Sequence, residues 1–127
     1  MGEYVAARLY MEQALITQKE VLGERNPDTA TSLNNLGLLL QDMGEYGAAW
    51  PYLEQALAIR KGVLGEKHPD TAGSLNNLGL LLHAMGEYAA AWPYYEQTLA
   101  IYQEVLGEKH GNTEAVRRNL EHLKTQI

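Results

Sequence analysis

The side chains best suited to acid–base or metal chemistry in this chain are its four histidines, because the chain contains no cysteine. His68 and His110 occupy equivalent turns of an internal repeat, which places them too far apart to share one metal ion. No two histidines have the HExxH spacing of zinc-binding helices, and no strained turn presents a serine nucleophile to a histidine. The sequence therefore predicts a protein that is not an enzyme and that uses no metal and no cofactor.

Paired asparagines are the second group whose chemistry needs an explanation. Asn34-Asn35 and Asn76-Asn77 lie in the middle of predicted helices, where asparagine has a poor intrinsic propensity. A side-chain amide offers both a hydrogen-bond donor and an acceptor, which suits contact with the main chain of another molecule. The same chemistry would serve hydrogen bonds between adjacent helices or a polar surface, so both interpretations stay open.

These residues belong to a sequence unit of 42 residues that occurs three times, at 1–42, 43–84 and 85–126. The first two copies differ at only 13 positions, and SLNNLGLLL is identical at 32–40 and 74–82. Such self-similarity predicts a solenoid in which each unit buries its apolar face only against its neighbours. We expect one repeat domain over residues 1–127.

Each unit reads as two helices, since apolar residues recur at helical spacing and no strand-like alternation is present. We expect a helix over 2–22, helix pairs over 27–64 and 69–106, and a last helix over 112–126. Asn26 and His68 are the predicted N-caps, each before a proline. Further expectations are helix ends at glycines, bends without breaks at two prolines, and packing of two tryptophans between stacked units: Gly23, Gly65, Gly107, Gly44, Gly86, Pro51, Pro93, Trp50 and Trp92.

The repeat resembles the tetratricopeptide repeat (TPR) at several fixed offsets. The matching residues are Leu36-Gly37, Gly44-Glu45-Tyr46, Ala49 and Ala56, then Leu78-Gly79, Gly86-Glu87-Tyr88 and Ala91, with Thr98 in place of the second alanine. The usual TPR period is about 34 residues, and the extra residues here lie in IRKGVLGEKHPDT. This longer form looks like the repeats of kinesin light chains and of nucleotide-binding signalling proteins, although no phosphate-binding loop occurs in this chain.

The resemblance implies an all-α fold, a right-handed α-solenoid of antiparallel helix pairs with six helices. Gly37 should let two helices approach closely, with Ala49 and Ala56 opposite. In the last copy Glu121 replaces this glycine, and Arg117, Arg118 and Lys124 replace apolar or amide residues. We therefore expect the last helix to be a polar cap.

The resemblance also implies that the first helix of each pair lines a concave groove for an extended peptide. By similarity to kinesin light chains, the second asparagine of each pair, together with Asn119, would hold the peptide backbone. Only one basic residue is among the groove positions, so we expect no carboxylate clamp and binding that survives high salt. The predicted site consists of Asn34, Asn35, Leu38, Asn76, Asn77, Leu80, His83, Arg118 and Asn119.

Charge and composition narrow the possible partners. The net charge of −6 disfavours nucleic acid and anionic membranes, and no apolar run is long enough to cross a bilayer. With no cysteine and no signal peptide, a cytoplasmic location is expected. The predicted function is a protein–protein interaction scaffold that binds a protein or peptide.

The alternative is a structural or assembly segment without a ligand of its own, which the high identity between repeats favours. Ala7 and Ala14 should form an apolar notch on the N-terminal helix, and such a notch invites self-association. Head-to-tail stacking is disfavoured because it would bring Glu121 where a glycine belongs. We expect a monomer or a weak homodimer through the N-terminal helix.

Overall fold

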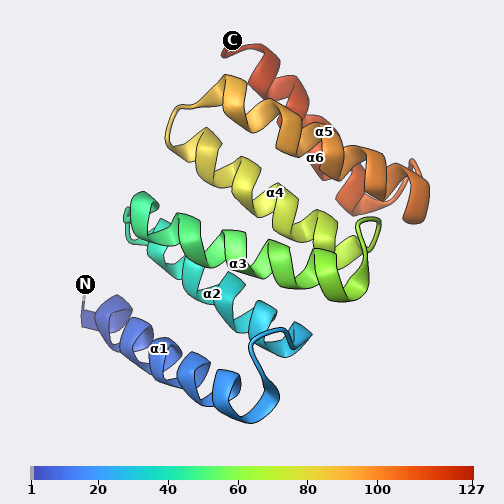
Figure 1. Ribbon diagram of the computed structural model, residues 1–127. Helices are drawn as coiled ribbons and strands as arrows, with labels where there is room; N and C mark the ends of the chain where they lie inside the picture. The colour runs from blue at the N-terminus through green and yellow to red at the C-terminus, as the bar shows by residue number, and fades with distance from the viewer. Residues whose placement is uncertain (1) are drawn as a thin grey trace. The chain divides into compact units, whose positions relative to one another are not determined.

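The computed structural model describes residues 2–127, and all regular structure in that range is α-helical (Figure 1). The helices are α1 (Gly2–Leu22), α2 (Pro27–Asp42), α3 (Tyr46–Leu64), α4 (Pro69–Ala84), α5 (Tyr88–Val105) and α6 (Gly111–Lys124). The chain divides into two compact units, Met1–Leu64 with α1–α3 and Gly65–Ile127 with α4–α6, called here the N-terminal and C-terminal units. The all-α prediction and the number of helices in this range are confirmed. α5 ends one residue before its predicted bound, and α6 begins one residue earlier and ends two residues earlier than predicted.

The helix starts follow from the side chains that precede each proline. Asn26 Oδ1 accepts a hydrogen bond from the Asp28 backbone N–H at 2.8 Å, and His68 Nδ1 accepts one from the Asp70 N–H at 3.0 Å. Both N-cap predictions are confirmed, with the proline in the first helical turn where its missing N–H costs nothing. In α6, His110 Nδ1 takes the same role for the Asn112 N–H at 3.1 Å.

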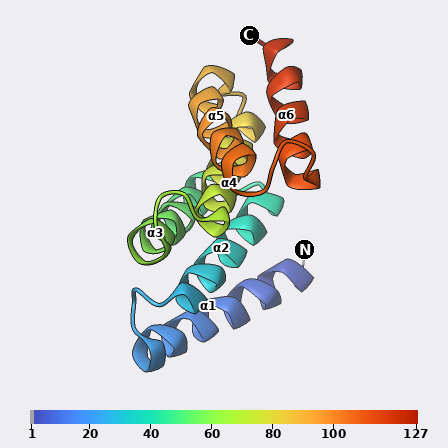
Figure 2. The same cartoon turned by 90° about the vertical axis from the view of Figure 1, so that its right-hand side faces the viewer.

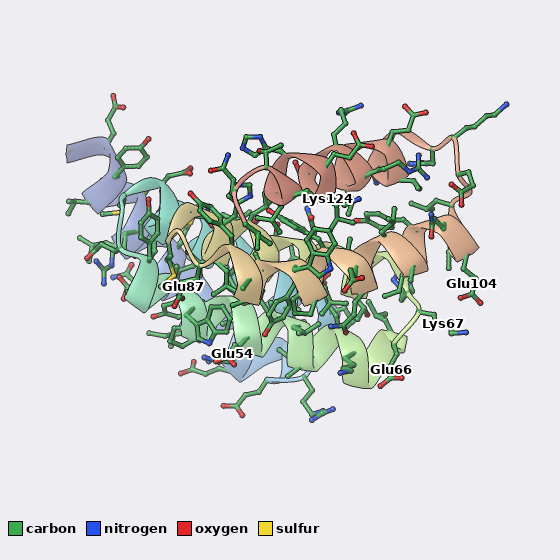
Figure 3. The ribbon with its side chains drawn as sticks, turned by 90° about the horizontal axis from the view of Figure 1, so that it is seen from above. Glu54, Glu66, Lys67, Glu87, Glu104 and Lys124 are labelled. Atoms are coloured by element: carbon green, nitrogen blue, oxygen red, sulfur yellow. The ribbon has the colours of Figure 1, made fainter. Side chains whose placement is uncertain are left out.

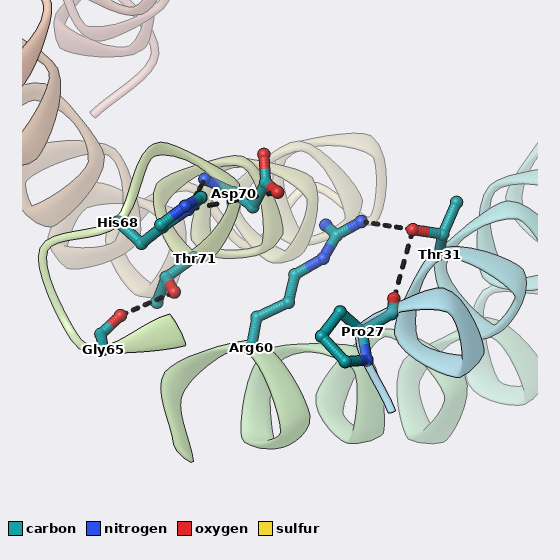
Figure 4. Close-up of polar contacts among 7 residues, drawn as sticks. All are labelled: Pro27, Thr31, Arg60, Gly65, His68, Asp70 and Thr71. Atoms are coloured by element: carbon teal, nitrogen blue, oxygen red, sulfur yellow. Dashed lines mark hydrogen bonds and ion pairs between the residues drawn. The ribbon is translucent and has the colours of Figure 1, made fainter. Parts of the chain in front are cut away.

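The turns between long and short helices share one hydrogen bond that the sequence analysis did not identify. The hydroxyl of Thr71 donates to the Gly65 carbonyl at 2.7 Å (Figure 4). Gly65 has a left-handed backbone, φ 101°, which glycine adopts without strain, as predicted for this helix end. The equivalent bonds join Thr29 to Gly23 and Thr113 to Gly107, at 2.9 and 2.8 Å. All three threonines are fully buried, and in the turns before α2 and before α6, which lie within one unit each, the hydroxyl fixes where the short helix leaves the preceding long one.

In the N-terminal unit the core lies between α2 and α3, where Leu33, Leu36, Leu40 and Leu53 are completely buried. A Cβ atom on Gly37 would lie 2.6 Å from Leu53 Cδ2 and 3.4 Å from the Ala49 carbonyl oxygen. The predicted close approach of helices at Gly37 is therefore confirmed. The nearest atoms come from Leu53, which lies between the two alanines expected there.

In the C-terminal unit an aromatic ring takes the place of that leucine. A Cβ on Gly79 would lie 2.9 Å from Cε1 of Tyr95, whose side chain is completely buried between α4 and its neighbours. Thr98, the departure from the alanine pattern, is buried and donates its hydroxyl to the Tyr94 carbonyl at 2.8 Å. Because its polar group is satisfied inside its own helix, threonine is tolerated at an alanine position.

The outer helix of this unit is amphipathic. Val116, Leu120 and Leu123 of α6 are buried, whereas Glu121 and Lys124 are exposed. Figure 2 shows α6 alongside α5 within this unit. A short ion pair between Lys67 Nζ and Glu104 Oε1, 3.1 Å, joins the turn before α4 to the end of α5 (Figure 3).

Pro51 and Pro93 lie inside α3 and α5, and both helices continue through them, as predicted. The bend expected there stays a prediction. Within residues 2–127, none of the helices has both the length and the apolar character that crossing a bilayer requires.

Candidate functional site

The predicted site residues lie on the short helices of each unit, and we call them the first-helix surface. In the N-terminal unit α2 carries three of them, Asn34, Asn35 and Leu38. In the C-terminal unit α4 and α6 carry the other six, Asn76, Asn77, Leu80, His83, Arg118 and Asn119. The concave groove and the ladder of asparagines across three helices stay predictions.

On α2 the side chain of Asn35 is exposed, while Asn34 and Leu38 are half-buried. Near the end of the same helix, Gln41 has a buried Oε1 for which the described structure provides no hydrogen-bond donor. A buried amide oxygen without a partner costs about 1–3 kcal/mol. This part of α2 therefore has a buried acceptor whose hydrogen-bonding capacity is unused.

A buried amide oxygen without a donor also occurs on α4. Asn76 and Asn77 are both half-buried, and Asn76 Oδ1 is a buried oxygen without a donor among the described residues. Leu80 is half-buried one turn further along the helix. α4 thus combines a buried, unsatisfied amide acceptor with a half-buried apolar side chain one turn away.

His83 brings the three helices of the C-terminal unit together. Its ring stacks on His122 of α6, with ring centroids 5.4 Å apart and planes at 25°. Its Nδ1 lies 3.2 Å from the Tyr95 hydroxyl of α5, and Tyr88 meets it edge-on at 5.4 Å. Burial, followed by the nearby charge of His122, lowers the pKa of His83 below its ordinary value.

On α6 the electrostatics of the site are mixed. Arg118 is exposed and shares a shallow hollow of about 230 Å³ with Glu114, Arg117 and Glu121. Arg117 also pairs with Glu108. With carboxylates this close, Arg118 does not form a strongly positive site.

Two concavities were not identified from the sequence. In the C-terminal unit a pocket of about 250 Å³ lies between α5 and α6, lined by Trp92, Leu99, Leu120 and other side chains, with Lys124 Nζ 6.0 Å from the Trp92 ring. Trp92 is half-buried and lines this pocket, and its predicted packing between stacked units stays a prediction. Its only sequence signal is that tryptophan occurs where the first copy has Arg8.

In the N-terminal unit a hollow of about 490 Å³ lies where the start of α1 meets the turn between α2 and α3. Tyr4 and Val5 supply its apolar wall. Arg8 is held there by Glu12 at 3.3 Å and Glu45 at 3.0 Å, so its charge is already neutralised. Within residues 2–127, no three metal-ligating side chains cluster as a metal site would require.

Comparison with known proteins identifies the repeat. The family model described as tetratricopeptide repeat matches residues 1–62, 34–104 and 70–126. No curated protein gives a significant match. Among solved structures, BtubC (BKLC) from P. vanneervenii is similar with a TM-score of 0.90 and 25% identity over 98% of this chain and 50% of that one.

A putative kinesin light chain from Podosopora anserina, with nearly identical TPR-like repeats, gives a TM-score of 0.88 at 26% identity, as does a point variant of the same protein. The match covers 98% of this chain and 59% of each of those. This chain thus spans about half the length of the solved chains that it matches. It belongs to the tetratricopeptide repeat family, with an all-α fold of the TPR solenoid type and repeats similar to those of kinesin light chains.

Proposed function

We propose that this chain is a non-catalytic scaffold that binds an extended peptide, or an extended segment of a partner protein, through its first-helix surface. TPR repeats are generally protein-interaction scaffolds, which supports the general part of this proposal. The observation that carries the specific part is the pair of buried amide oxygens without donors, Gln41 Oε1 and Asn76 Oδ1.

The chemistry of an extended main chain complements these groups. A peptide strand presents unpaired N–H and C=O groups. An amide side chain that rotates outward to accept a backbone N–H gains a hydrogen bond and gives up a buried position in which its oxygen has no donor. Asn35 is exposed on α2 and offers both a donor and an acceptor to the strand. Leu38 and Leu80 provide apolar contacts for side chains of the bound segment.

Charge contributes little to this mode of binding. Arg118 is the one basic residue of the predicted site, and the carboxylates of Glu114 and Glu121 line the same hollow. The net charge of −6 also disfavours nucleic acid as the ligand. We place this function in the cytoplasm because the chain has no cysteine to form disulfides; microscopy of a fluorescently tagged chain tests this location.

The test begins with a randomised peptide library displayed on phage and selected on the purified protein. Peptides that bind are then titrated by calorimetry against Asn35→Ala and Asn77→Ala, with Gln55→Ala on the exposed face of α3 as the matched control. We expect the asparagine variants to lose about tenfold or more in affinity, because each lost hydrogen bond leaves a peptide group unpaired.

The stability of Asn35→Ala should not fall, because Asn35 is exposed and alanine favours a helix more than asparagine does. Selected peptides that bind all three variants as tightly as the parent would contradict the proposal. If no peptide is selected while both asparagine variants unfold more easily, the amides serve architecture instead.

One observation favours a second role in self-association. The described part of α1 exposes seven large apolar side chains, Tyr4, Val5, Leu9, Tyr10, Ile16, Val21 and Leu22. We propose that α1 mediates a weak homodimer through these exposed apolar side chains. Sedimentation velocity over a concentration series should show a dimer that Leu9→Gln and Ile16→Gln weaken and that Val63→Gln, an exposed apolar residue on α3, does not; monomers at all concentrations would refute it.

A further inference from the structure

All four histidines of the chain fall within the C-terminal unit; His122 lies in α6, His110 caps that helix and His83 contacts it. At the start of α6, the His110 ring nitrogen accepts the Asn112 N–H. Near its end, the His122 ring stacks on His83 of α4. Both contacts depend on neutral imidazoles, because a protonated ring has no acceptor nitrogen and two protonated rings repel each other.

The repeat shows that the fold does not need histidine at these positions. The residue equivalent to His83 in the first copy is Gln41, and the residues equivalent to His122 are Leu38 and Leu80. The equivalent of His110 in the first copy is Asn26, which caps α2 with its amide oxygen. Two independent departures from the repeat therefore meet in one ring contact.

The surroundings of His83 oppose its protonation. Burial raises the pKa of Tyr95 to about 12, so its hydroxyl stays protonated and adds no negative charge beside His83 Nδ1, which lies 3.2 Å from it. Burial also disfavours the charged form of His83 itself. Tyr88 contributes only the edge of its ring.

No carboxylate in the described C-terminal unit compensates for charge on this pair. Glu87, labelled in Figure 3, and Glu121 are the acidic residues nearest to the pair in sequence, and neither forms an ion pair with His83 or His122. A positive charge on either ring would therefore act mainly on the other ring across the α4–α6 contact.

The N-cap of α6 also lacks a carboxylate that could compensate for a protonated ring. In α4 a carboxylate oxygen of Asp70 lies 3.9 Å from His68 Nδ1 and can compensate for a charged ring (Figure 4). In α6 the equivalent residue is Asn112, and within residues 2–127 neither Glu108 nor Glu114 forms an ion pair with His110, while the neighbouring Lys109 is itself a cation. A protonated His110 would both lose its hydrogen bond and place positive charge at a helix N-terminus.

We propose that α6 is an acid-released helix: protonation of His83, His110 and His122 separates it from α4 and α5, while the N-terminal unit, which has no histidine, stays folded. Release would expose Val116, Leu120 and Leu123 together with the side chains that they cover. This regulation does not depend on peptide binding and would operate whatever the partner.

Proton linkage decides whether acid favours or disfavours the docked form of α6. Because the folded state lowers the pKa of His83, the unfolded state binds its proton more readily. The docked form of α6 is therefore fully favoured above the ordinary histidine pKa of about 6.5 and loses stability as the pH falls below it.

The test is hydrogen exchange followed by mass spectrometry at pH 7.5 and 5.5, with rates corrected for intrinsic pH dependence. We expect the protection of α6 amides to fall by roughly tenfold or more in acid while that of α2 amides changes little. Equal losses in α2 and α6, no loss in α6, or an α6 that is unprotected even at pH 7.5 would each overturn the proposal.

Variants built from the chain's own repeats separate this mechanism from general acid destabilisation. His83→Gln, His110→Asn and His122→Leu combined should retain α6 protection at pH 5.5. His68→Asn, which changes a cap already compensated by Asp70, should leave the loss in α6 as in the parent. If the triple variant loses protection as the parent does, the histidines are not the cause.

Discussion

Gly79 tests most sharply whether close helix packing holds each unit together. Changing Gly79 to alanine places a methyl group 2.9 Å from Cε1 and 3.0 Å from Cδ1 of Tyr95, a ring that is completely buried and hydrogen-bonded to His83. Carbon atoms prefer about 3.5–4.0 Å, so the ring or the helix must move. Gly73, on the same helix, is the matched control, because its new methyl group would be 3.8 Å from the nearest atom, the Tyr102 hydroxyl.

The two substitutions should change the free energy of unfolding in different ways. Alanine favours a helix over glycine by about 1 kcal/mol, which should appear almost undiminished in Gly73→Ala. In Gly79→Ala the same gain is opposed by overpacking of about 1–3 kcal/mol. We therefore expect Gly79→Ala to be less stable than Gly73→Ala by about 1–3 kcal/mol.

Urea unfolding followed by circular dichroism measures this difference, provided that the slope of the transition is the same in both variants. Gly37→Ala repeats the test in the N-terminal unit, where the new methyl group meets Leu53 at 2.6 Å. If Gly79→Ala proves as stable as Gly73→Ala, the glycine does not mark a close contact between α4 and α5, and the packing described here is wrong.

The remaining predictions concern binding, the turns and protonation. The affinity for peptides selected on the first-helix surface should change less than about threefold between 50 and 500 mM salt, because Arg118, the one basic residue of the site, lies beside two carboxylates. A steep loss of affinity with salt, measured by calorimetry, would point to ionic recognition. Thr71→Val should lower the free energy of unfolding by about 0.5–1.5 kcal/mol, because the side chain of the buried Thr71 no longer donates a hydrogen bond to the Gly65 carbonyl; an unchanged melting temperature would show that this bond is dispensable. In His122→Leu the pKa of His83, followed by NMR titration, should rise toward its ordinary value yet stay below it, since burial remains; a further fall would contradict the assigned causes.

The repeat made much of the fold predictable, because residues that pack between helices occur at equivalent positions in two copies of the unit. Gly37 and Gly79 recur at one position, and only close contact explains a glycine kept there in the middle of a helix. What could not be predicted is the atom that each glycine meets, Leu53 in one unit and Tyr95 in the other. That choice depends on the rotation of the long helix, which its nearly continuous apolar sequence leaves open.

The candidate site was predictable as a surface but not in its electrostatics. The positions of Asn35 and Asn77 follow from helix periodicity and the resemblance, whereas the missing donors of Gln41 and Asn76 depend on which atoms are nearby in space. The contact between His83 and His122 is similar. Both residues break the repeat, which is a usable signal, but their sequence positions reveal the contact only once α4 and α6 are placed side by side.

Recognition of an extended peptide by side-chain amides is tested most directly by NMR of the asparagine and glutamine NH₂ groups during titration with a selected peptide. The proposed mode predicts that the signals of Asn35, Asn76, Asn77 and Gln41 shift together and that those of Gln55 and Gln97 on the long helices do not. Shifts confined to α3 and α5, with the first-helix amides unchanged, would contradict it.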